Sequence, residues 1–195
     1  MRGSSSPAAL RSTSAFRHSP GHEPTASARS ECRRHFRDAG VVSPEPPGYE
    51  CPFCTIVAGG GEPPFTVHND VVVQTAATTA WISSRWWERN AGHVIVVPNE
   101  HVENMYGVEP GLAGAIHETA RRVALAMRRA YGCEGVSTRQ HNEPAGYQEV
   151  WHYHLHVFPR YAGDNLYGSR WRDTTPDERL PYAELVRDAL TRAPT

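Results

Sequence analysis

The chain contains no lysine, because all 20 of its basic residues are arginine. This absence excludes mechanisms that pass through a lysine amine, such as a Schiff base or a lysyl-nucleotide, and phosphate loops that need the lysine of a Gly-Lys-Ser/Thr motif. The 195 residues carry a formal net charge of −1, which argues against a protein that binds nucleic acid through a broadly basic face. Histidine is abundant instead, with 11 residues, and it is the side chain that titrates nearest to neutral pH.

Long apolar runs are also missing. The longest aliphatic run, Val94 to Val97, is far shorter than the roughly 20 residues of a membrane-spanning helix, and the first 30 residues contain no apolar segment typical of a secretory signal. We therefore expect a cytoplasmic protein with no membrane partner. The chain has four cysteines, and the pair Cys51 and Cys54, in a sequence without an export signal, indicates metal or redox chemistry more than a structural disulfide.

The composition divides the chain into an N-terminal tail and a folded part. Residues 1–48 contain nine serines, six prolines and seven arginines against four acidic residues, with almost no apolar periodicity, so they are predicted to be disordered. Their arginine and serine content superficially resembles an organellar transit peptide, but a tail without a specific function or an upstream start codon explains it equally well. A single domain is predicted over residues 49–172, followed by a helical C-terminal extension over residues 173–195.

The periodicity of the folded part predicts an α+β fold with an antiparallel sheet. Residues 112–131 have apolar side chains at helical spacing between Pro110-Gly111 and Gly132, which predicts one long helix. A second amphipathic helix is predicted over residues 180–191. Short β-branched or apolar runs bounded by turn residues predict strands at 71–75, 79–82, 93–97, 136–139 and 150–158.

The most informative segment runs from Val150 to Phe158 and reads Val-Trp-His-Tyr-His-Leu-His-Val-Phe. In a strand, alternate side chains point to opposite faces, so His152, His154 and His156 are expected to share one face while the apolar residues between them face the core. Imidazoles in a row are costly to bury without a metal, a phosphate or a hydrogen bond. Two other interpretations are that the histidines cover a solvent-facing strand, or that a His-x-His pair holds the metal of a hydrolase. The second would need carboxylates, and few occur nearby.

Three segments, in the same order, resemble the histidine triad family across most of residues 51–172. The segment 152–158 is similar to the family signature, in which three histidines alternate with apolar or aromatic residues. Cys51-Pro-Phe-Cys54 resembles the family's opening strand region, and Gly92-His-Val-Ile-Val-Val-Pro98 resembles the segment that leads into its long helix. The resemblance implies a HIT-like fold, a nucleotide as partner and a homodimer.

The resemblance also implies a reaction. Members of the family act on nucleoside phosphoramidates or dinucleoside polyphosphates, as hydrolases or nucleotidyltransferases, and cleave at the α-phosphate through a nucleotidyl-histidine. Here the middle histidine, His154, would be the nucleophile, and His156 would contact phosphate oxygens and stabilise the developing charge. An imidazole with a pKa of about 6.5 can attack phosphorus at physiological pH if its other nitrogen donates to a fixed acceptor, commonly a backbone carbonyl. The alternative from another class is a zinc-stabilised nucleotide-binding or interaction module with little turnover.

A structural zinc site is a further implication. Zinc-bearing members of the family complete the cysteine pair with a histidine after the Val-Val-Pro strand and with the first triad histidine, which gives Cys51, Cys54, His101 and His152 here. Because all four ligands would come from protein, no position would remain for a metal-bound water, and the zinc would not be the catalyst. The alternatives for the cysteine pair are a redox site or two small buried hydrophobic residues.

The loop before the triad departs from the family pattern. Residues 140–148 resemble the family's Asn-x-Gly-x-x-Ala-Gly-Gln loop, but Glu143 lacks the expected glycine nearby and Tyr147 interrupts the Gly-Gln pair. Turn backbone and amide side chains in such a loop can hold phosphate oxygens. The resemblance therefore implies phosphate contacts from Asn142, Gly146 and Gln148.

A second departure concerns the ribose. Many members carry an acidic residue in the strand before the Gly-His segment, where it hydrogen-bonds the ribose hydroxyls, but residues 81–87 contain none and the first carboxylate is Glu88. Trp86 and Trp87 offer rings that could stack on a base, although aromatic residues in such a segment more often belong to the core. The base and ribose preference therefore does not follow from the resemblance.

Overall fold

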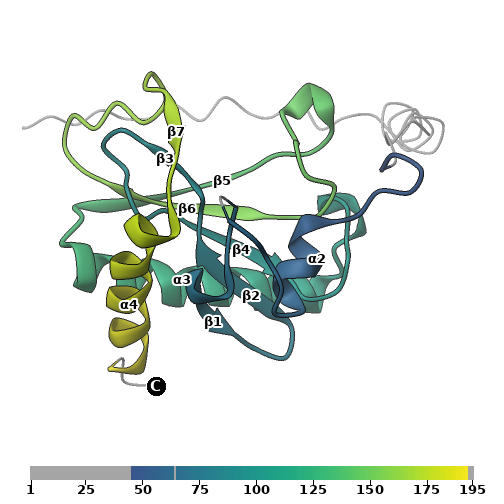
Figure 1. Cartoon of the computed structure of the whole chain (residues 1–195), viewed down its shortest axis with the longest axis horizontal. Coiled ribbons are helices and arrows are strands. Elements are labelled where there is room, and N and C mark those ends of the chain that lie inside the picture. Colours follow the sequence, from purple (N-terminus) through teal and green to yellow (C-terminus); the bar gives the residue numbers. More distant parts are fainter. Residues whose placement is uncertain (1–44, 64, 193–195) are drawn as a thin grey trace, which may run out of the picture. The chain divides into compact units, whose positions relative to one another are not determined.

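The computed structural model describes residues 45–63 and 65–192. The predicted disordered tail falls mainly on residues 1–44, which lie outside the described residues. Within the described ranges, every helix is too short or too polar to span a bilayer. The elements, shown in Figure 1, are α2 (Pro52–Val57), η1 (His68–Asp70), β1 (Val71–Gln74), β2 (Thr78–Ile82), β3 (Arg85–Trp87), β4 (Val94–Pro98), η2 (Met105–Gly107), α3 (Pro110–Tyr131), β5 (Gly135–Gln140), η3 (Pro144–Gly146), β6 (Leu155–Arg160), β7 (Trp171–Asp173) and α4 (Pro176–Thr191).

Five strands form one antiparallel sheet in the order β1-β2-β4-β6-β5, which confirms the predicted α+β fold. Of the three inner strands, β2 and β4 are buried along their whole length, and Trp81 lies opposite Ile95 in their register. β6 lies between β4 and β5. This position places His156 opposite Ile95 on one side and opposite Arg139 on the other.

The long helix α3 crosses one face of the sheet (Figure 1). It begins two residues before the predicted start, with Pro110 in its first turn, and ends at Gly132, whose φ of 64° lies in the left-handed region that favours glycine. Its apolar side chains recur every three or four residues, so that one stripe of the helix packs on the strands. The buried members of that stripe include Ile116, Ala120, Val123 and Met127.

The C-terminal helix α4 packs into the same core as α3. It starts at Pro176, earlier than predicted, because Thr175 and Glu178 form a capping box in which each side chain accepts from the other residue's backbone N–H. Arg179 is fully buried, and its Nε donates to Asp70 Oδ2 over 2.9 Å. This ion pair fastens α4 to the turn before β1.

The predicted strand over residues 150–158 is wrong in its first half. β6 begins only at Leu155, because the backbone N–H of Tyr153 donates to the Val102 carbonyl over 2.6 Å, in the loop after β4, rather than to a neighbouring strand. Of the three triad histidines, His156 alone lies in the strand. The alternation of side chains survives in the extended segment, since the apolar residues that follow each histidine still face the core: Tyr153, Leu155 and Val157.

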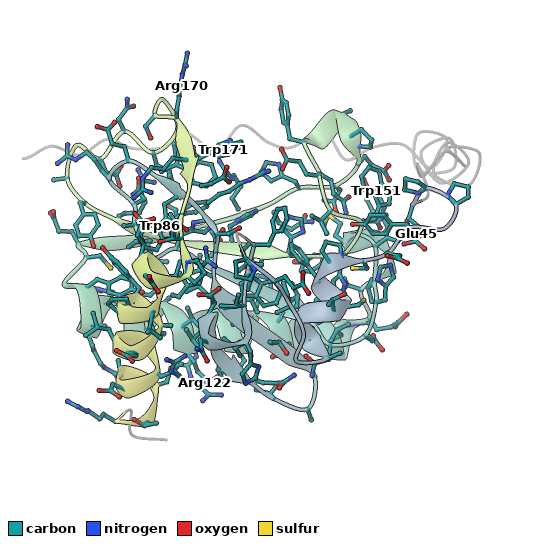
Figure 2. The ribbon with its side chains drawn as sticks, in the orientation of Figure 1. Glu45, Trp86, Arg122, Trp151, Arg170 and Trp171 are labelled. Carbon is teal, nitrogen blue, oxygen red and sulfur yellow. The ribbon has the colours of Figure 1, made fainter. Side chains whose placement is uncertain are left out.

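The opening segment is a helix rather than the expected strand. Cys51 caps α2, with its Sγ accepting from the backbone N–H of Cys54 over 3.5 Å, and Pro52 fits the first turn. The cap therefore brings both cysteine sulfurs to the N-terminal end of α2. Figure 2 shows Glu45 and Trp151 at this same end of the molecule.

β3 and β7 pair into a separate two-stranded ribbon, in which Trp87 lies opposite Trp171. Figure 2 labels Trp86 on β3 and Trp171 on β7. Trp86 is buried against Tyr182 of α4, with ring centroids 4.8 Å apart, so it is a core residue. Because adjacent residues of a strand point to opposite faces, Trp87 faces the other way, toward the candidate site.

Candidate active site

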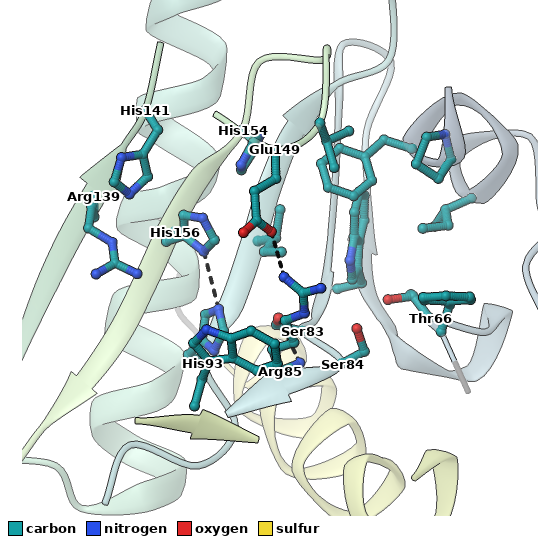
Figure 3. Close-up of a pocket in the computed structure, with 18 of the residues that line it drawn as sticks. Thr66, Ser83, Ser84, Arg85, His93, Arg139, His141, Glu149, His154 and His156 are labelled. Atoms are coloured by element: carbon teal, nitrogen blue, oxygen red, sulfur yellow. Dashed lines mark hydrogen bonds and ion pairs between the residues drawn. The ribbon is translucent and has the colours of Figure 1, made fainter. Parts of the chain in front are cut away.

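A cavity of about 710 Å³ lies over the strands β2, β4 and β6 and is closed on one side by the β3–β7 ribbon (Figure 3). This volume is typical of a small-molecule site. The lining is apolar at one end, where side chains of α2 meet the sheet, and polar at the other. The apolar end includes Phe53, Ile56, Trp81 and Ile95, and the polar end includes Arg139, His141, His154 and His156.

His154 is held in one orientation at the centre of this cavity. Its Nδ1 lies 2.7 Å from the His152 carbonyl oxygen, which can only accept, so Nδ1 carries the proton and Nε2 carries the lone pair. Burial is the main cause that lowers the pKa of His154 below its ordinary value, so the ring is neutral at pH 7. Phe53 contacts it edge-on, with ring centroids 5.3 Å apart. A neutral, oriented imidazole next to a cavity is suited to nucleophilic attack.

His156 and His93 form a second pair of neutral imidazoles. The Nδ1 of His156 lies 3.2 Å from the Nε2 of His93, so one ring donates to the other. Burial, reinforced for His93 by the charge of Arg139, lowers the pKa of His93 to about 3. Burial together with the neighbouring histidines lowers the pKa of His156 well below 6.5. His156 lines the cavity, so its remaining nitrogen is available to a ligand.

Two of the predicted phosphate contacts, Gln148 and Asn142, have side chains that bond to the backbone of the loop and of residues 103–105. Gln148 is buried, and its side-chain amide donates to the Glu103 carbonyl over 2.6 Å while its Oε1 accepts from the Glu143 backbone N–H over 2.8 Å. The Asn142 Oδ1 accepts from the backbone N–H of Met105 over 2.9 Å. These contacts fix the positive-φ turn at Glu143 that shapes the loop.

Other residues of that loop reach the cavity. The lining includes His141, Tyr147 and Glu149, whereas Asn142, Gly146 and Gln148 are not among the lining residues of the described chain. The Gly146 carbonyl accepts from His141 Nδ1. The cavity thus brings His154 and His156 together, and phosphate contacts from Asn142, Gly146 and Gln148 stay predictions.

An ion pair joins the two sides of the cavity. Arg85 of β3 donates through its Nη1 to Glu149 Oε2 over 2.5 Å, and the pair is marked in Figure 3. Trp171 of β7 supports it, with its ring 4.2 Å below the Arg85 guanidinium carbon. Residues 81–87 lack a carboxylate, but the fold supplies one to the cavity from Glu149, in a distant part of the sequence.

A second cluster of side chains, which includes His152, suits a metal ion. The sulfurs of Cys51 and Cys54 and one ring nitrogen each of His101 and His152 all lie within 4.8 Å of one another. The Cys51 sulfur is 3.3 Å from His152 Nδ1, and the Cys54 sulfur is 3.3 Å from His101 Nδ1. Such separations match the edges of a small tetrahedron with a metal at its centre.

The second nitrogens of both histidines are also engaged, as expected for metal ligands. His152 Nε2 donates to the Pro98 carbonyl over 3.0 Å, and His101 Nε2 lies 3.0 Å from Glu45 Oε2. Both Nδ1 atoms face the cysteines, and these outer contacts are the arrangement of histidine ligands supported by a carbonyl or carboxylate. The four residues therefore fit a metal ion by donor type, separation and outer contacts.

Sequence reasoning missed several residues of the site. The clearest is Arg139, whose position in β5 places it opposite His156 of β6. The sequence held a signal for this residue, because an arginine in the predicted strand 136–139 comes within reach of the triad once that strand pairs with the triad strand. Arg85, Glu149 and Phe53 had no comparable signal, since their contacts with the cavity depend on packing between distant segments.

Comparisons with known proteins agree with this geometry. The HIT domain family matches residues 70–163. The chain is 30% identical over 142 residues to the Protein hit of Bacillus subtilis (strain 168), covering 73% of this chain and 92% of that protein. It is 24% identical over 153 residues to the adenylylsulfatase HINT3 of Arabidopsis thaliana, covering 77% of this chain and 74% of that protein.

A solved structure carries the same fold. The Zn-bound histidine triad family protein from Mycobacterium smegmatis superimposes with a TM-score of 0.61 and 28% sequence identity, covering 73% of this chain and 94% of that one. The family match includes β1 to β6 and all three triad histidines, and the bacterial relative matches over most of its length. The chain therefore belongs to the histidine triad (HIT) family.

Proposed function

We propose that the protein is a nucleoside phosphate hydrolase or nucleotidyltransferase that acts at the α-phosphate through a nucleotidyl intermediate on His154. The observation that carries the proposal is the 2.7 Å bond from His154 Nδ1 to the His152 carbonyl, which directs the unprotonated Nε2 of a neutral ring to the cavity. The activity named for the Arabidopsis relative, an adenylylsulfatase, supports a reaction of this class.

In the first half-reaction, His154 Nε2 attacks the α-phosphorus of the nucleotide. A P–N bond forms, and the bond from phosphorus to the leaving group breaks, with the electron pair going to the leaving group. If His93 donates its Nε2 proton to His156 Nδ1, then His156 presents its own Nε2–H to the phosphate oxygens, where negative charge develops. The same N–H can protonate an amine as it leaves.

In the second half-reaction, water or another acceptor attacks the phosphorus. The P–N bond breaks, its electron pair returns to His154 Nε2, and the attacking water loses a proton to give the nucleoside monophosphate. His156 is again placed to stabilise the charge and to take up that proton if it has delivered its own to the first leaving group.

Zinc is the metal that the donor set of the second cluster favours, and Cys51, Cys54, His101 and His152 would be its four ligands. With four protein ligands, zinc would supply structural stability and no catalytic water. His152 would join the two sites, because its ring lies in the cluster while its carbonyl orients His154. Family membership supports a homodimer as well, which light scattering after gel filtration would test.

Replacement of His154 tests the proposed function. The variant His154→Ala should lose about a thousandfold or more in turnover on adenosine phosphoramidates, adenylyl sulfate and diadenosine polyphosphates, because no other group can form the intermediate. The wild-type protein should show a burst of leaving group and a nucleotidyl adduct that mass spectrometry locates on His154. His117→Ala, at an exposed position of α3, is the matched control and should keep full activity. Full activity of His154→Ala would refute the mechanism.

A further inference from the structure

Arg139 is a cation in the cavity that no carboxylate neutralises. Among the described residues, it has no ion-pair partner, and its Nε is buried without a hydrogen-bond acceptor. Aromatic rings hold the guanidinium instead, since its central carbon lies 4.8 Å from the ring centroid of Trp87 and 5.0 Å from that of Phe158. Burial lowers the pKa of Arg139 below its ordinary value, but an arginine remains charged. A charged guanidinium in a cavity, without a carboxylate partner among the described residues, is suited to bind an anion.

The contacts along the cavity place this cation beyond the nucleophile. Phe53 contacts Trp81 at 5.1 Å and His154 at 5.3 Å between ring centroids. His154 in turn contacts His156 at 5.1 Å, and His156 stacks on Phe158 at 5.6 Å. Because Arg139 lies over Phe158, the apolar end and Arg139 are on opposite sides of His154. Figure 3 shows the same order, with Arg139 and His141 on the far side of His156 from Glu149 and Thr66.

This order fits a nucleotide whose base occupies the apolar end and whose α-phosphate lies at His154 and His156. The group attached to the α-phosphate then extends toward Arg139. A guanidinium presents N–H donors in a planar fork that matches the oxygens of phosphate or sulfate. An uncharged amine offers no such match.

We propose that Arg139 binds the leaving group and makes the enzyme select nucleotides whose leaving group is a phosphate or sulfate oxyanion over those that release a neutral amine. The inference rests on the proposed attack by His154. When the P–O bond breaks, the electron pair stays on the departing oxygen, and the leaving group gains negative charge that the guanidinium stabilises more in the transition state than in the bound substrate. An amine leaves with a proton, so it gains no net negative charge for Arg139 to stabilise.

The test compares leaving groups on a constant adenosine. The value of kcat/KM is measured for adenylyl sulfate and diadenosine triphosphate and for an adenosine phosphoramidate of an uncharged amine. Arg139→Gln should lower the first two by about tenfold or more and the last by less than about threefold. Arg139→Lys should recover part of the loss on the anionic substrates, because it keeps the charge but not the fork. Arg128→Gln, at an exposed position of α3, should change none of them.

Equal losses on all substrates, or no loss on any, would overturn the inference. Thermal unfolding midpoints of the two Arg139 variants identify a purely structural defect, which would also lower the amidate reaction. Titration of inorganic pyrophosphate by calorimetry gives a readout that needs no turnover, and Arg139→Gln should weaken its binding by about tenfold or more relative to the wild type. Unchanged pyrophosphate binding in that variant would count against Arg139 as an anion site.

The same measurements separate this inference from the proposed function. If the wild type turns over nucleotides and labels His154 but Arg139→Gln shows no preference, the mechanism stands and the role of Arg139 is wrong. If His154 is never labelled and no substrate is cleaved, the mechanism is wrong, and the pyrophosphate titration alone decides whether Arg139 binds an oxyanion.

Discussion

The Nε2 atom of His93 lies 3.2 Å from the Nδ1 atom of His156, and a single proton shared between two neutral rings satisfies this contact. A further proton on either ring would create a positive charge in a buried region already close to the Arg139 guanidinium. The fold therefore resists protonation of His93, which is fully buried.

Resistance to protonation predicts a loss of stability in acid. Between pH 6.5 and about 3, the unfolded chain binds a proton on His93 that the folded chain does not, so the free energy of unfolding falls as the pH falls through this window. His93→Phe removes the titrating group and keeps an aromatic ring next to Phe158. Between pH 7 and 5, this variant should lose about 2 kcal/mol less stability than the wild type in urea titrations.

The control for the acid experiment is His117→Gln, which changes an exposed histidine of α3 and should follow the wild-type pH dependence. Parallel curves for His93→Phe and the wild type would show that His93 titrates in the folded protein as freely as in the unfolded one.

The metal cluster predicts a structural dependence on zinc. The purified protein should contain about one zinc ion per chain, and Cys54→Ser should lose it, because a hydroxyl is a poor replacement for a thiolate ligand. If the free zinc concentration is about a thousandfold above the Kd for zinc, losing the zinc lowers the free energy of unfolding by about 4 kcal/mol. The unfolding midpoint should therefore fall by several degrees or more. Metal content is measured by mass spectrometry and unfolding by calorimetry.

Cys133→Ser is the matched control, since Cys133 is buried in the core away from the cluster and should leave the zinc content unchanged. Retention of stoichiometric zinc by Cys54→Ser would exclude this cysteine as a ligand. A chelator that removed the metal and left the unfolding midpoint unchanged would contradict a structural role for the zinc.

The ion pair between Arg179 and Asp70 predicts a large effect of a single substitution. Arg179→Met leaves the Asp70 carboxylate buried without its charged partner, and the free energy of unfolding should fall by about 3–5 kcal/mol. The measurement is urea unfolding at pH 7. Arg192→Met, in the exposed pair with Asp188 near the end of the same helix, should change stability by less than about 0.5 kcal/mol. Similar losses in the two variants would contradict the importance of burial.

The pair between Arg85 and Glu149 predicts an effect on binding rather than on stability. Both side chains are substantially exposed, so Glu149→Gln should change the free energy of unfolding by less than about 1 kcal/mol. The same substitution removes a negative charge from the cavity and frees the Nη1 atom of Arg85 for the phosphates of a nucleotide, while Arg85 Nε keeps its contact with Asp173 Oδ1 at 3.7 Å. The Kd for AMP measured by calorimetry should therefore fall, by about threefold or more. A weaker affinity would indicate that the carboxylate itself contacts the ligand.

Local patterns were enough to predict most of the fold. Leu112 to Tyr131 carries its own start and stop signals and a continuous apolar stripe, and the structure places a helix there. The segment before Leu155 was mispredicted as a strand because alternation alone does not reveal that the Tyr153 backbone bonds to Val102, far away in sequence.

The candidate site was predictable only in part, for a similar reason. The triad histidines and the cysteine pair are short motifs, so His152, His154 and His156 could be identified from their spacing. The place of Arg139 in a short strand directly before the loop was a usable signal, because that strand pairs with the triad strand. Glu149 reaches the cavity through loop packing, which leaves no mark in a short stretch of sequence. Gln148 stays a predicted phosphate contact, and in the structure its side chain bonds to the backbone of Glu143 within the loop and of Glu103 outside it.

His152 serves two sites with two parts of one residue, since its ring lies against Cys51 while its carbonyl accepts from His154. A rotation of this residue that followed loss of the metal would also turn the carbonyl, and His154 would lose the contact that selects its reactive tautomer. Preparations in which only some chains hold zinc should then behave as mixtures of active and inactive molecules. Their specific activity should rise in proportion to zinc content, with an unchanged KM.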